Sequence, residues 1–395
     1  MTTDVSKISL PLKLTFLIFS IVLNCMGIVI LQLSEAKVTY EKLGFLESFK
    51  DLPIAFISLF AVNFISRFGT KKSLILALTI VGICSLILPF TEVFWFYKLW
   101  FAIIGTCFAI GKICVFGIIR NNISDEKSLA KTMNSVEASF MIGIFVVNTG
   151  FGWLISSQFS QFWKFGFLSV SILSAVAIFL FIKLPIAEPE KVKDENLLKD
   201  LSAILNPSVF IFLAIIFSIV FLEQSFNSWL PSFYKKHLKV NSFFALQASS
   251  FLALFSYVGR TITANIIHRF SLSKYYMGCI SMIVIVLLMI IGIQFFDTDD
   301  SKALLFLFPV IGLFVSPLYP VVNSKMIAKI DKSKANLFTS LIVIFSSLGS
   351  SVSSIIMAGL FGNQLLSLYA VYILCAVIVI FIISLIYFKF ADEKI

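Results

Sequence analysis

The sequence is poor in charged residues. Charged side chains make up 13% of the 395 residues, whereas 59% of the residues are hydrophobic and the mean hydropathy is +1.00. Soluble domains usually have about twice this share of charge. The shortage of charge therefore excludes a soluble globular protein, and the chain is predicted to cross a membrane many times.

Histidine is scarce and cysteine is unpaired in sequence. The chain has only two histidines, His237 and His268, and its six cysteines lie in apolar runs without a C-x-x-C pair. No His, Cys or carboxylate cluster has metal-binding or catalytic spacing, and no P-loop pattern is present. We therefore expect no enzymatic activity, no catalytic residue, no metal and no other cofactor.

The formal net charge of +10 does not indicate nucleic acid as a partner. The basic residues lie in short loops between apolar runs, with no basic stripe and no RNA-type aromatic motif. The loops on one side of the predicted bundle, with both termini, carry most of the Lys and Arg residues, including Arg260. By the positive-inside rule, we expect a multi-pass protein of the cell (inner) membrane with cytoplasmic N- and C-termini.

Apolar windows of about 20 residues, the length that spans a bilayer, recur twelve times. The predicted spans are 12–33, 43–65, 73–91, 94–119, 132–157, 165–185, 208–231, 241–266, 275–295, 303–326, 335–360 and 366–388. A mixed-charge segment separates the first six from the last six. The predicted fold is an all-α membrane protein with a six-helix bundle at 1–186, a cytoplasmic linker at 187–207 and a second six-helix bundle at 208–395.

Two similar loops indicate that the halves are repeats. RFGTKKS, Arg67–Ser73, and RFSLSKY, Arg269–Tyr275, each lie between the second and third helix of a half. With twelve spans and a middle linker, the segment VNFISRFGTK, Val62–Lys71, resembles the major facilitator superfamily over essentially the whole chain. Arg67, Gly69 and Lys71 match the family loop motif, while Val62 and Ser66 replace its glycine and its acidic residue.

The resemblance implies an activity. Members of this family are secondary active transporters that work by alternating access, and their helix 2–3 loop contributes to the inner gate, here Arg67, Gly69, Lys71 and the repeat residue Arg269. We expect proton-coupled symport of a small polar solute, such as a sugar, an amino acid or an organic anion, by a monomer. The alternative is a transporter-like sensor or assembly protein without net transport.

A narrower resemblance concerns two segments of the second half. Gly259–Lys274 and Gly312–Ile330 resemble the fucose/galactose-type permease branch. The acidic residues that this branch uses in helices 1 and 4 are replaced, because helix 1 offers Asn24 and helix 4 offers Lys112. A sugar substrate therefore does not follow from the resemblance.

Polar residues within the spans are the candidates for the substrate and proton pathway, because such residues usually face a cavity or a partner. Lys112 and Glu137 lie at similar depths on consecutive helices, so they form either a functional ion pair or a static salt bridge. Glu223 and Asn227 are four apart and share one helix face. Asn24, Gln32 and Asn323 complete this set. Hydrogen bonds that only join helices are the alternative for Glu223 and for the neutral residues.

The second span begins with charges. Glu47, Lys50 and Asp51 are predicted to lie in its outer third and to form an outer gate, in which Glu47 or Asp51 pairs with the loop 235–239. A local Glu47–Lys50 pair is the alternative. Trp229, near the outer end of the seventh span, is predicted to be an interface anchor.

Three further patterns concern the packing of the helices. Spans 3, 6, 9 and 12 contain no charge and are predicted to be peripheral. Pro309, Pro317 and Pro320 can bend or open the tenth helix. The serine-rich segment 346–354 is predicted to provide close helix packing.

Overall fold

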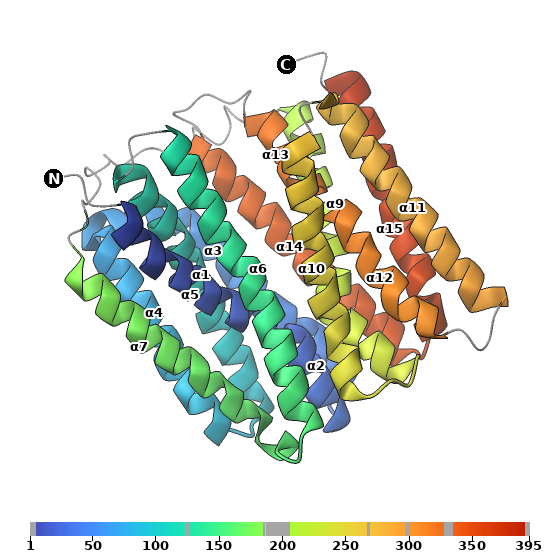
Figure 1. Cartoon of the computed structure of the whole chain (residues 1–395), viewed down its shortest axis with the longest axis horizontal. Helices are drawn as coiled ribbons and strands as arrows, with labels where there is room; N and C mark the ends of the chain where they lie inside the picture. Colours follow the sequence, from blue (N-terminus) through green and yellow to red (C-terminus); the bar gives the residue numbers. More distant parts are fainter. Residues whose placement is uncertain are drawn as a thin grey trace. The chain divides into compact units, whose positions relative to one another are not determined.

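The part of the chain that the computed structural model describes is helical throughout (Figure 1). The structure describes residues 5–122, 126–184, 186, 206–266, 269–296, 301–327 and 335–391. The side chains of some residues within these ranges, including Glu137, lie outside the description, as does nearly all of the predicted linker at 187–207.

The helices follow the predicted spans closely. In the first half they are α1 (Val5–Asn24), α2 (Met26–Glu35), α3 (Tyr40–Phe68), α4 (Thr70–Ile87), α5 (Phe94–Asn122), α6 (Glu126–Ser156) and α7 (Leu168–Lys183). In the second half they are α9 (Pro207–Lys236), α10 (Ser242–Ile266), α11 (Leu272–Phe296), α12 (Ser301–Val315), α13 (Leu318–Ile327), α14 (Ala335–Gly362) and α15 (Tyr369–Ile386).

The prediction of twelve spans is confirmed. In the described part of the chain, eleven helical segments are long and apolar enough to cross a membrane. The remaining predicted span is α3, whose 29 residues extend about 43 Å at 1.5 Å per residue. This length exceeds the roughly 30 Å of a hydrocarbon core. The protein is therefore an all-helical, multi-pass membrane protein.

Two spans are interrupted helices. The span Ile8–Glu35 consists of α1 and α2, which meet at Cys25, and the span Ala303–Asn323 contains α12 and the start of α13. Ser316 and Pro317 separate α12 from α13. Proline has no N–H to donate, so it weakens the helix at this point, as the sequence predicted. Transporters often place binding sites at such interruptions.

The start of α9 shows why the second half begins where it does. The side-chain oxygen of Asn206 accepts a hydrogen bond from the backbone N–H of Val209 at 2.9 Å, and Pro207 is the first helical residue. Asparagine is a strong N-cap residue, and proline suits the first helical position. Local chemistry therefore fixes this boundary one residue before the predicted start at 208.

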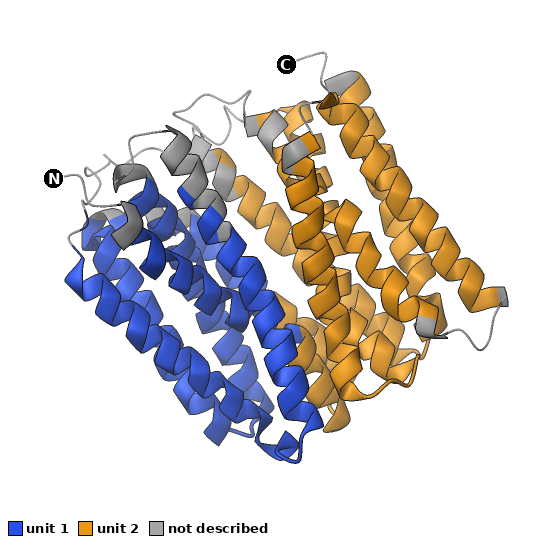
Figure 2. Ribbon diagram, in the orientation of Figure 1, with its two compact units in different colours: residues 1–26, 49–195 blue, residues 27–48, 196–395 orange. Residues whose placement is uncertain are grey.

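The chain forms two compact units, which Figure 2 shows in different colours. Unit 1 comprises Met1–Met26 and Phe49–Glu195, and unit 2 comprises Gly27–Ser48 and Asn196–Ile395. In unit 1, α1 packs on α6, and α4 packs on α5 and α7. In unit 2, α9 packs on α14, and α10 packs on α12. The units thus differ from the predicted division of the sequence, because Gly27–Ser48 packs within unit 2.

The backbone adds a second trace of the internal repeat. Lys37 and Lys239 both have positive φ, 64° and 54°, and each is followed by a valine and by the start of the next helix. Residue 37 pairs with 239 and residue 67 with 269, so both pairs are 202 residues apart. A non-glycine residue seldom adopts positive φ. The shared conformation at the same repeat position therefore agrees with duplicated halves.

Three of the four charge-free spans are the least buried. The most apolar windows of α7 and α15 are 28% buried and that of α11 is 33% buried, compared with 83% for the first span. The window of α4 is 44% buried, as is that of α6. The prediction of peripheral positions therefore holds for α7, α11 and α15. It does not hold for α4, which is as buried as the charge-bearing α6.

Candidate functional site

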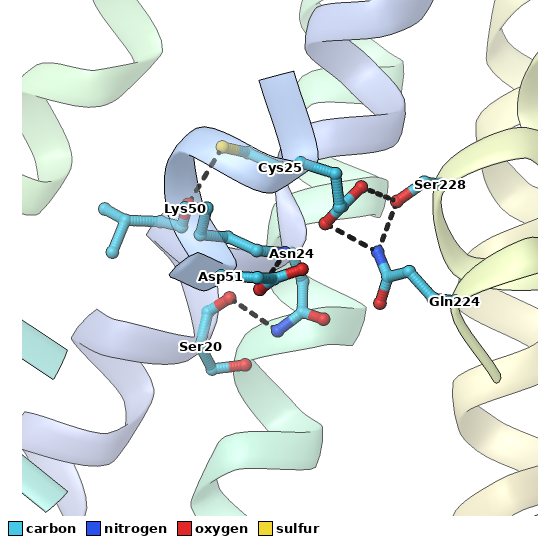
Figure 3. Close-up of polar contacts among 9 residues, drawn as sticks. Ser20, Asn24, Cys25, Lys50, Asp51, Gln224 and Ser228 are labelled. Atoms are coloured by element: carbon cyan, nitrogen blue, oxygen red, sulfur yellow. Dashed lines mark hydrogen bonds and ion pairs between the residues drawn. The ribbon is translucent and has the colours of Figure 1, made fainter. Parts of the chain in front are cut away.

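The Glu47 carboxylate is fully buried in unit 2 and bonded to α9. Gln224 Nε2 donates to Glu47 Oε1 at 2.8 Å, and Ser228 Oγ donates to Glu47 Oε2 at 2.8 Å. Gln224 also donates to Ser228, and Figure 3 shows these bonds as dashed lines. Sequence reasoning selected Glu223 and Asn227 instead. Gln224 and Ser228 have the same four-residue spacing and lie about 100° further around the helix.

Small residues allow the segment Gly27–Ser48 to approach its neighbours closely. A Cβ atom added to Gly27 would lie 3.0 Å from the carbonyl oxygen of Asn227 on α9. A Cβ atom added to Gly44 would collide with the Cβ atom of Ala358 on α14. Close contact of this kind places the Glu47 carboxylate within reach of α9.

The prediction that Trp229 is an interface anchor is wrong. Trp229 is fully buried, its Nε1 donates to Ser354 Oγ at 3.0 Å, and its ring lies 5.1 Å from that of Phe361. Tyr40, the first residue of α3, packs on the same two rings. Proximity to a helix end suggested an interface position, but packing within unit 2 covers this residue completely.

The serine-rich segment of α14 provides close packing, as predicted. The hydroxyls of Ser225 on α9 and Ser353 on α14 share a hydrogen bond of 2.8 Å. A Cβ atom on Gly349 would collide with the carbonyl oxygen of Phe217. The two helices therefore meet through small side chains, which permit interhelical hydrogen bonds.

Lys50 and Asp51 form an ion pair within unit 1. Lys50 Nζ lies 3.7 Å from Asp51 Oδ1, and the two residues are only 5% and 4% exposed. The carbonyl of Lys50 packs tightly against Gly105 of α5. Lys50 thus has a partner in its neighbour Asp51, and the local Glu47–Lys50 pair stays a prediction. A pair this deeply buried is costly to break on one side.

The interruption at Cys25 lies beside a polar contact between helices. Asn24 Nδ2 donates to the carbonyl of Ser20 at 2.9 Å, and Cys25 Sγ donates to that of Val22 at 3.2 Å (Figure 3). Ser20 Oγ donates to the carbonyl of Phe140 on α6. Asn24 is partly exposed, but its amide N–H is used within its own helix.

Charged groups also meet at the end of α2. Gln32 Nε2 donates to Glu35 Oε2 at 3.2 Å, and Glu35 Oε1 lies 3.5 Å from Lys235 Nζ at the end of α9. The predicted outer gate assigned the loop 235–239 to Glu47 or Asp51. In the structure Lys235 pairs with Glu35, and Glu47 accepts hydrogen bonds from Gln224 and Ser228, so a pairing of Glu47 or Asp51 with this loop stays a prediction. Gln32 thus belongs to a helix end in this structure.

Lys112 lies in α5 among aromatic rings of unit 1. Its Nζ is 5.8 Å from the centroid of the Phe108 ring, and the rings of Phe19 and Phe140 lie 5.5 Å and 6.4 Å from that of Phe108. The Glu137 side chain lies outside the described residues, so the Lys112–Glu137 pair stays a prediction.

Glu223 has a charged neighbour that the sequence did not reveal. The guanidinium of Arg260 in α10 acts electrostatically on the Glu223 carboxylate. Arg260 lies three residues before the end of the span Ser242–Thr263, within the predicted span 241–266. Asn227 and Asn323 are partly exposed, and Asn323 Oδ1 has no hydrogen-bond partner among the described residues.

The loop between α3 and α4 explains two residues of the family motif. Gly69 has φ 89°, a conformation that glycine adopts without steric cost. Lys71 Nζ donates to the carbonyl of Leu184 at 2.7 Å and to that of Ile182 at 3.3 Å. Lys71 therefore caps the C-terminal end of α7. Arg67 and Arg269 are exposed.

No group of three or more His, Cys, Asp or Glu residues in the described ranges could hold a metal ion. Glu35, Glu47 and Asp51 have hydrogen-bond donors or basic side chains as neighbours. The chemistry available in these groups is ion pairing, hydrogen bonding and proton exchange.

Several solved structures share the fold. A D-xylose–proton symporter matches with a TM-score of 0.79 and 12% identity, covering 98% of each chain. A nucleoside transporter matches with a TM-score of 0.74 and 15% identity, covering 97% of this chain and 100% of that one. A bacterial homologue of the human lysosomal transporter Spinster, in an inward-facing and occupied conformation, matches with a TM-score of 0.68 and 15% identity, covering 99% and 96%. These likenesses establish the fold alone.

A comparison of the sequence with family profiles identifies the family. No curated protein matches the chain significantly. The sequence profile described as Major Facilitator Superfamily matches residues 14–354, which is most of the chain. The match agrees with the twelve helices, the repeated halves and the loop around Gly69. The chain is thus a secondary transporter, not an enzyme, and it belongs to the major facilitator superfamily.

Proposed function

We propose that the protein moves a small polar solute, namely a sugar, an amino acid or an organic anion, across the cell (inner) membrane together with protons. The observation that carries this proposal is the set of ionisable side chains within the spans, above all Lys112, Glu223 and Arg260. Such groups are costly in a bilayer and usually belong to a pathway. The xylose–proton symporter of the same fold is a precedent for a polar solute and for protons.

The substrate and proton pathway comprises the polar residues predicted from sequence. They are Asn24, Gln32, Lys112, Glu137, Glu223, Asn227 and Asn323. The interruptions at Cys25 and at Ser316–Pro317 support a site near the middle of the spans, since broken helices present main-chain groups to a solute. Resemblance to the fucose/galactose-type permease branch remains a prediction, and it does not select a sugar.

The outer gate includes Glu47, Lys50 and Asp51, with the contacts of Glu47 to α9 forming when the outer side closes. This assignment rests on cytoplasmic termini, which put the start of α3 at the outer face. The fully buried carboxylate with two donors from α9 supports it, because opening would have to replace both bonds. The inner gate comprises Arg67, Gly69, Lys71 and Arg269. We expect the transporter to act as a monomer.

Transport by purified protein in proteoliposomes tests the proposal. An imposed inward proton gradient should drive accumulation of at least one labelled solute from a panel of sugars, amino acids and organic anions. Dissipating the gradient with a protonophore should abolish accumulation while leaving exchange intact. Accumulation that persists without the gradient would contradict proton coupling. No uptake or exchange of any solute, by protein that remains monodisperse, would favour the sensor alternative.

A further inference from the structure

Five phenylalanine rings of unit 1 form one continuous group beside Lys112. We call them the phenylalanine cluster: Phe16 and Phe19 on α1, Phe108 and Phe116 on α5, and Phe140 on α6. Their ring centroids are 5.5 to 6.4 Å apart in the pairs that link the cluster. Three of these pairs meet edge to face, at 62° to 72°. Aromatic rings prefer this geometry at these separations.

The side of α5 that carries Lys112 differs from the side that faces outward. Leu99 is among the exposed apolar residues of α5. Phe108 follows it by nine residues, which is about two and a half turns, so the two side chains lie on opposite faces. Lys112 follows Phe108 by four residues and lies on the same face. Phe108 and Lys112 are both partly exposed, so their exposure belongs to the interior side of the helix.

Lys112 and the phenylalanine cluster offer a ligand two kinds of interaction, hydrogen bonds from an ammonium group and contact with aromatic rings. The Lys112 ammonium has three hydrogens to donate, and phenylalanine rings contain no conventional acceptor. A ring face attracts a cation, but it replaces only part of the hydration that the ammonium loses. An anion on the ligand would supply an acceptor. The predicted partner Glu137 would hold the ammonium in the absence of ligand and release it when the ligand anion binds.

We propose that Lys112 and the phenylalanine cluster form a subsite for an organic anion with an aromatic or other flat apolar body. The ligand carboxylate would bind Lys112, and its ring would extend the edge-to-face packing of the cluster. This inference deepens the proposed transport function and rests on it for its physiological meaning. It favours a solute with a carboxylate and an apolar ring over a sugar, because a neutral sugar has no anion for Lys112.

Binding of benzoate to the purified full-length protein, measured by calorimetry in detergent, tests the subsite. Benzamide keeps the ring and lacks the charge, acetate keeps the charge and lacks the ring, and galactose lacks both. A charge-assisted hydrogen bond contributes enough for benzoate to bind about 10- to 100-fold more tightly than benzamide. Acetate and galactose should bind at least about tenfold more weakly than benzoate. Equal or tighter binding of benzamide, acetate or galactose overturns the proposal.

Two substitutions and a matched control separate the parts of the subsite. Lys112→Met should lower the affinity for benzoate to that for benzamide, whereas Lys112→Arg should keep the preference for benzoate over benzamide. Lys98 is the control, because it also lies on α5 and its Nζ is 5.2 Å and 5.3 Å from the rings of Phe49 and Phe94. Lys98→Met should leave the preference unchanged. An equal loss in both methionine variants would overturn the assignment to Lys112.

The ring contribution is tested by Phe140→Leu. This change keeps an apolar side chain and removes one aromatic ring of the cluster. The affinity for benzoate should therefore fall several-fold, while the affinity for acetate should not change. A loss shared by both ligands would instead indicate a general structural change and would contradict the ring contact. Size-exclusion profiles identify variants that do not fold, and Lys112→Arg then still tests the charge.

Failure of the subsite differs from failure of transport, since binding needs no gradient. If benzoate binds through Lys112 but no solute crosses proteoliposomes, the subsite stands and the proposed transport function fails. If another solute is transported and benzoate neither binds nor competes with it, transport stands and the subsite is wrong.

Discussion

Glu47 and the Lys50–Asp51 pair lie on the same helix, α3, within about one turn of each other, yet they are stabilised differently. Glu47 receives hydrogen bonds from two neutral side chains of α9, which lie 177 and 181 residues away in sequence. Lys50 and Asp51 are adjacent and neutralise each other inside unit 1. The comparison shows that three neighbouring charges have two kinds of partner, side chains distant in sequence for Glu47 and an adjacent residue for Lys50 and Asp51.

The difference matters for alternating access. A local ion pair can move with its unit and keep its geometry. The bonds of Glu47 depend on the position of α9, so any motion that separates α3 from α9 must replace them with other partners or with water. Glu47 and α9 both lie in unit 2, so these bonds break only if the start of α3 moves against α9 within that unit, which is the motion that the proposed outer gate requires. Four substitutions test this contrast, from the largest expected effect to the smallest.

Breaking the local pair should have the largest effect on stability. Lys50→Met leaves the Asp51 carboxylate buried without its ammonium partner, and such a change costs about 3 to 5 kcal/mol. The free energy of unfolding in detergent measures the loss. The double variant Lys50→Met with Asp51→Leu should recover most of it, since neither charge of the pair remains. A loss below about 1 kcal/mol for the single variant would show that the pair is not structural.

Removing the Glu47 carboxylate should cost less stability but change the outer gate. Glu47→Ala leaves Gln224 Nε2 and Ser228 Oγ without their acceptor, at about 1 to 3 kcal/mol. If the contact closes the outer side, a cysteine in place of Tyr40 should react faster with an impermeant maleimide in this variant. Glu41→Ala, an exposed carboxylate on the same helix, is the control. Unchanged labelling would remove Glu47 from the gate.

Removing a single hydrogen-bond donor to Glu47 should cost less stability than removing the carboxylate. Ser228→Ala removes one of the two bonds, and interhelical hydrogen bonds in membrane proteins average about 0.6 kcal/mol. A double-mutant cycle with Glu47→Ala should give a coupling free energy of this size. Ser218→Ala is the matched control, because Ser218 Oγ donates to the carbonyl of Ala214 in its own helix. Coupling of Ser218 to Glu47 as strong as that of Ser228 would contradict the assignment.

The smallest expected effect concerns pH and the end of α9, the helix whose side chains bind Glu47. His237 follows α9, and burial lowers the pKa of its imidazole. As pH falls through the usual histidine value of about 6.5, the unfolded chain takes up a proton that the folded chain resists. Stability should therefore decrease below this pH. His237→Gln should flatten that part of the profile, and an identical profile in the variant would assign the effect to another group.

Features local to one segment could be predicted from the sequence. Apolar windows located the spans, the prolines located the opening of the tenth helix, and RFGTKKS with RFSLSKY indicated the repeat. Each of these depends on composition or on neighbouring residues, which act through hydropathy and backbone geometry. Gly69 belongs to this group, since a positive φ favours glycine at a turn.

Contacts between spans could not be predicted in the same way. In a bilayer every face of a helix can be apolar, so hydropathy does not distinguish a face toward lipid from a face toward another helix. Glu223 and Asn227 therefore looked as suitable as Gln224 and Ser228, and Trp229 looked like an interface residue although it is fully buried.

The sequence by itself determined that this protein is a twelve-span transporter of repeated halves, with charges that demand partners. Tertiary structure alone decided that Glu47 binds side chains of α9 and that rings from α1 and α6 pack on Phe108 beside Lys112. The physical reason is how far along the sequence each interaction acts. Hydrophobic length and turn chemistry act along the chain, whereas a hydrogen bond or a ring contact requires a close approach that only the packing of distant helices provides.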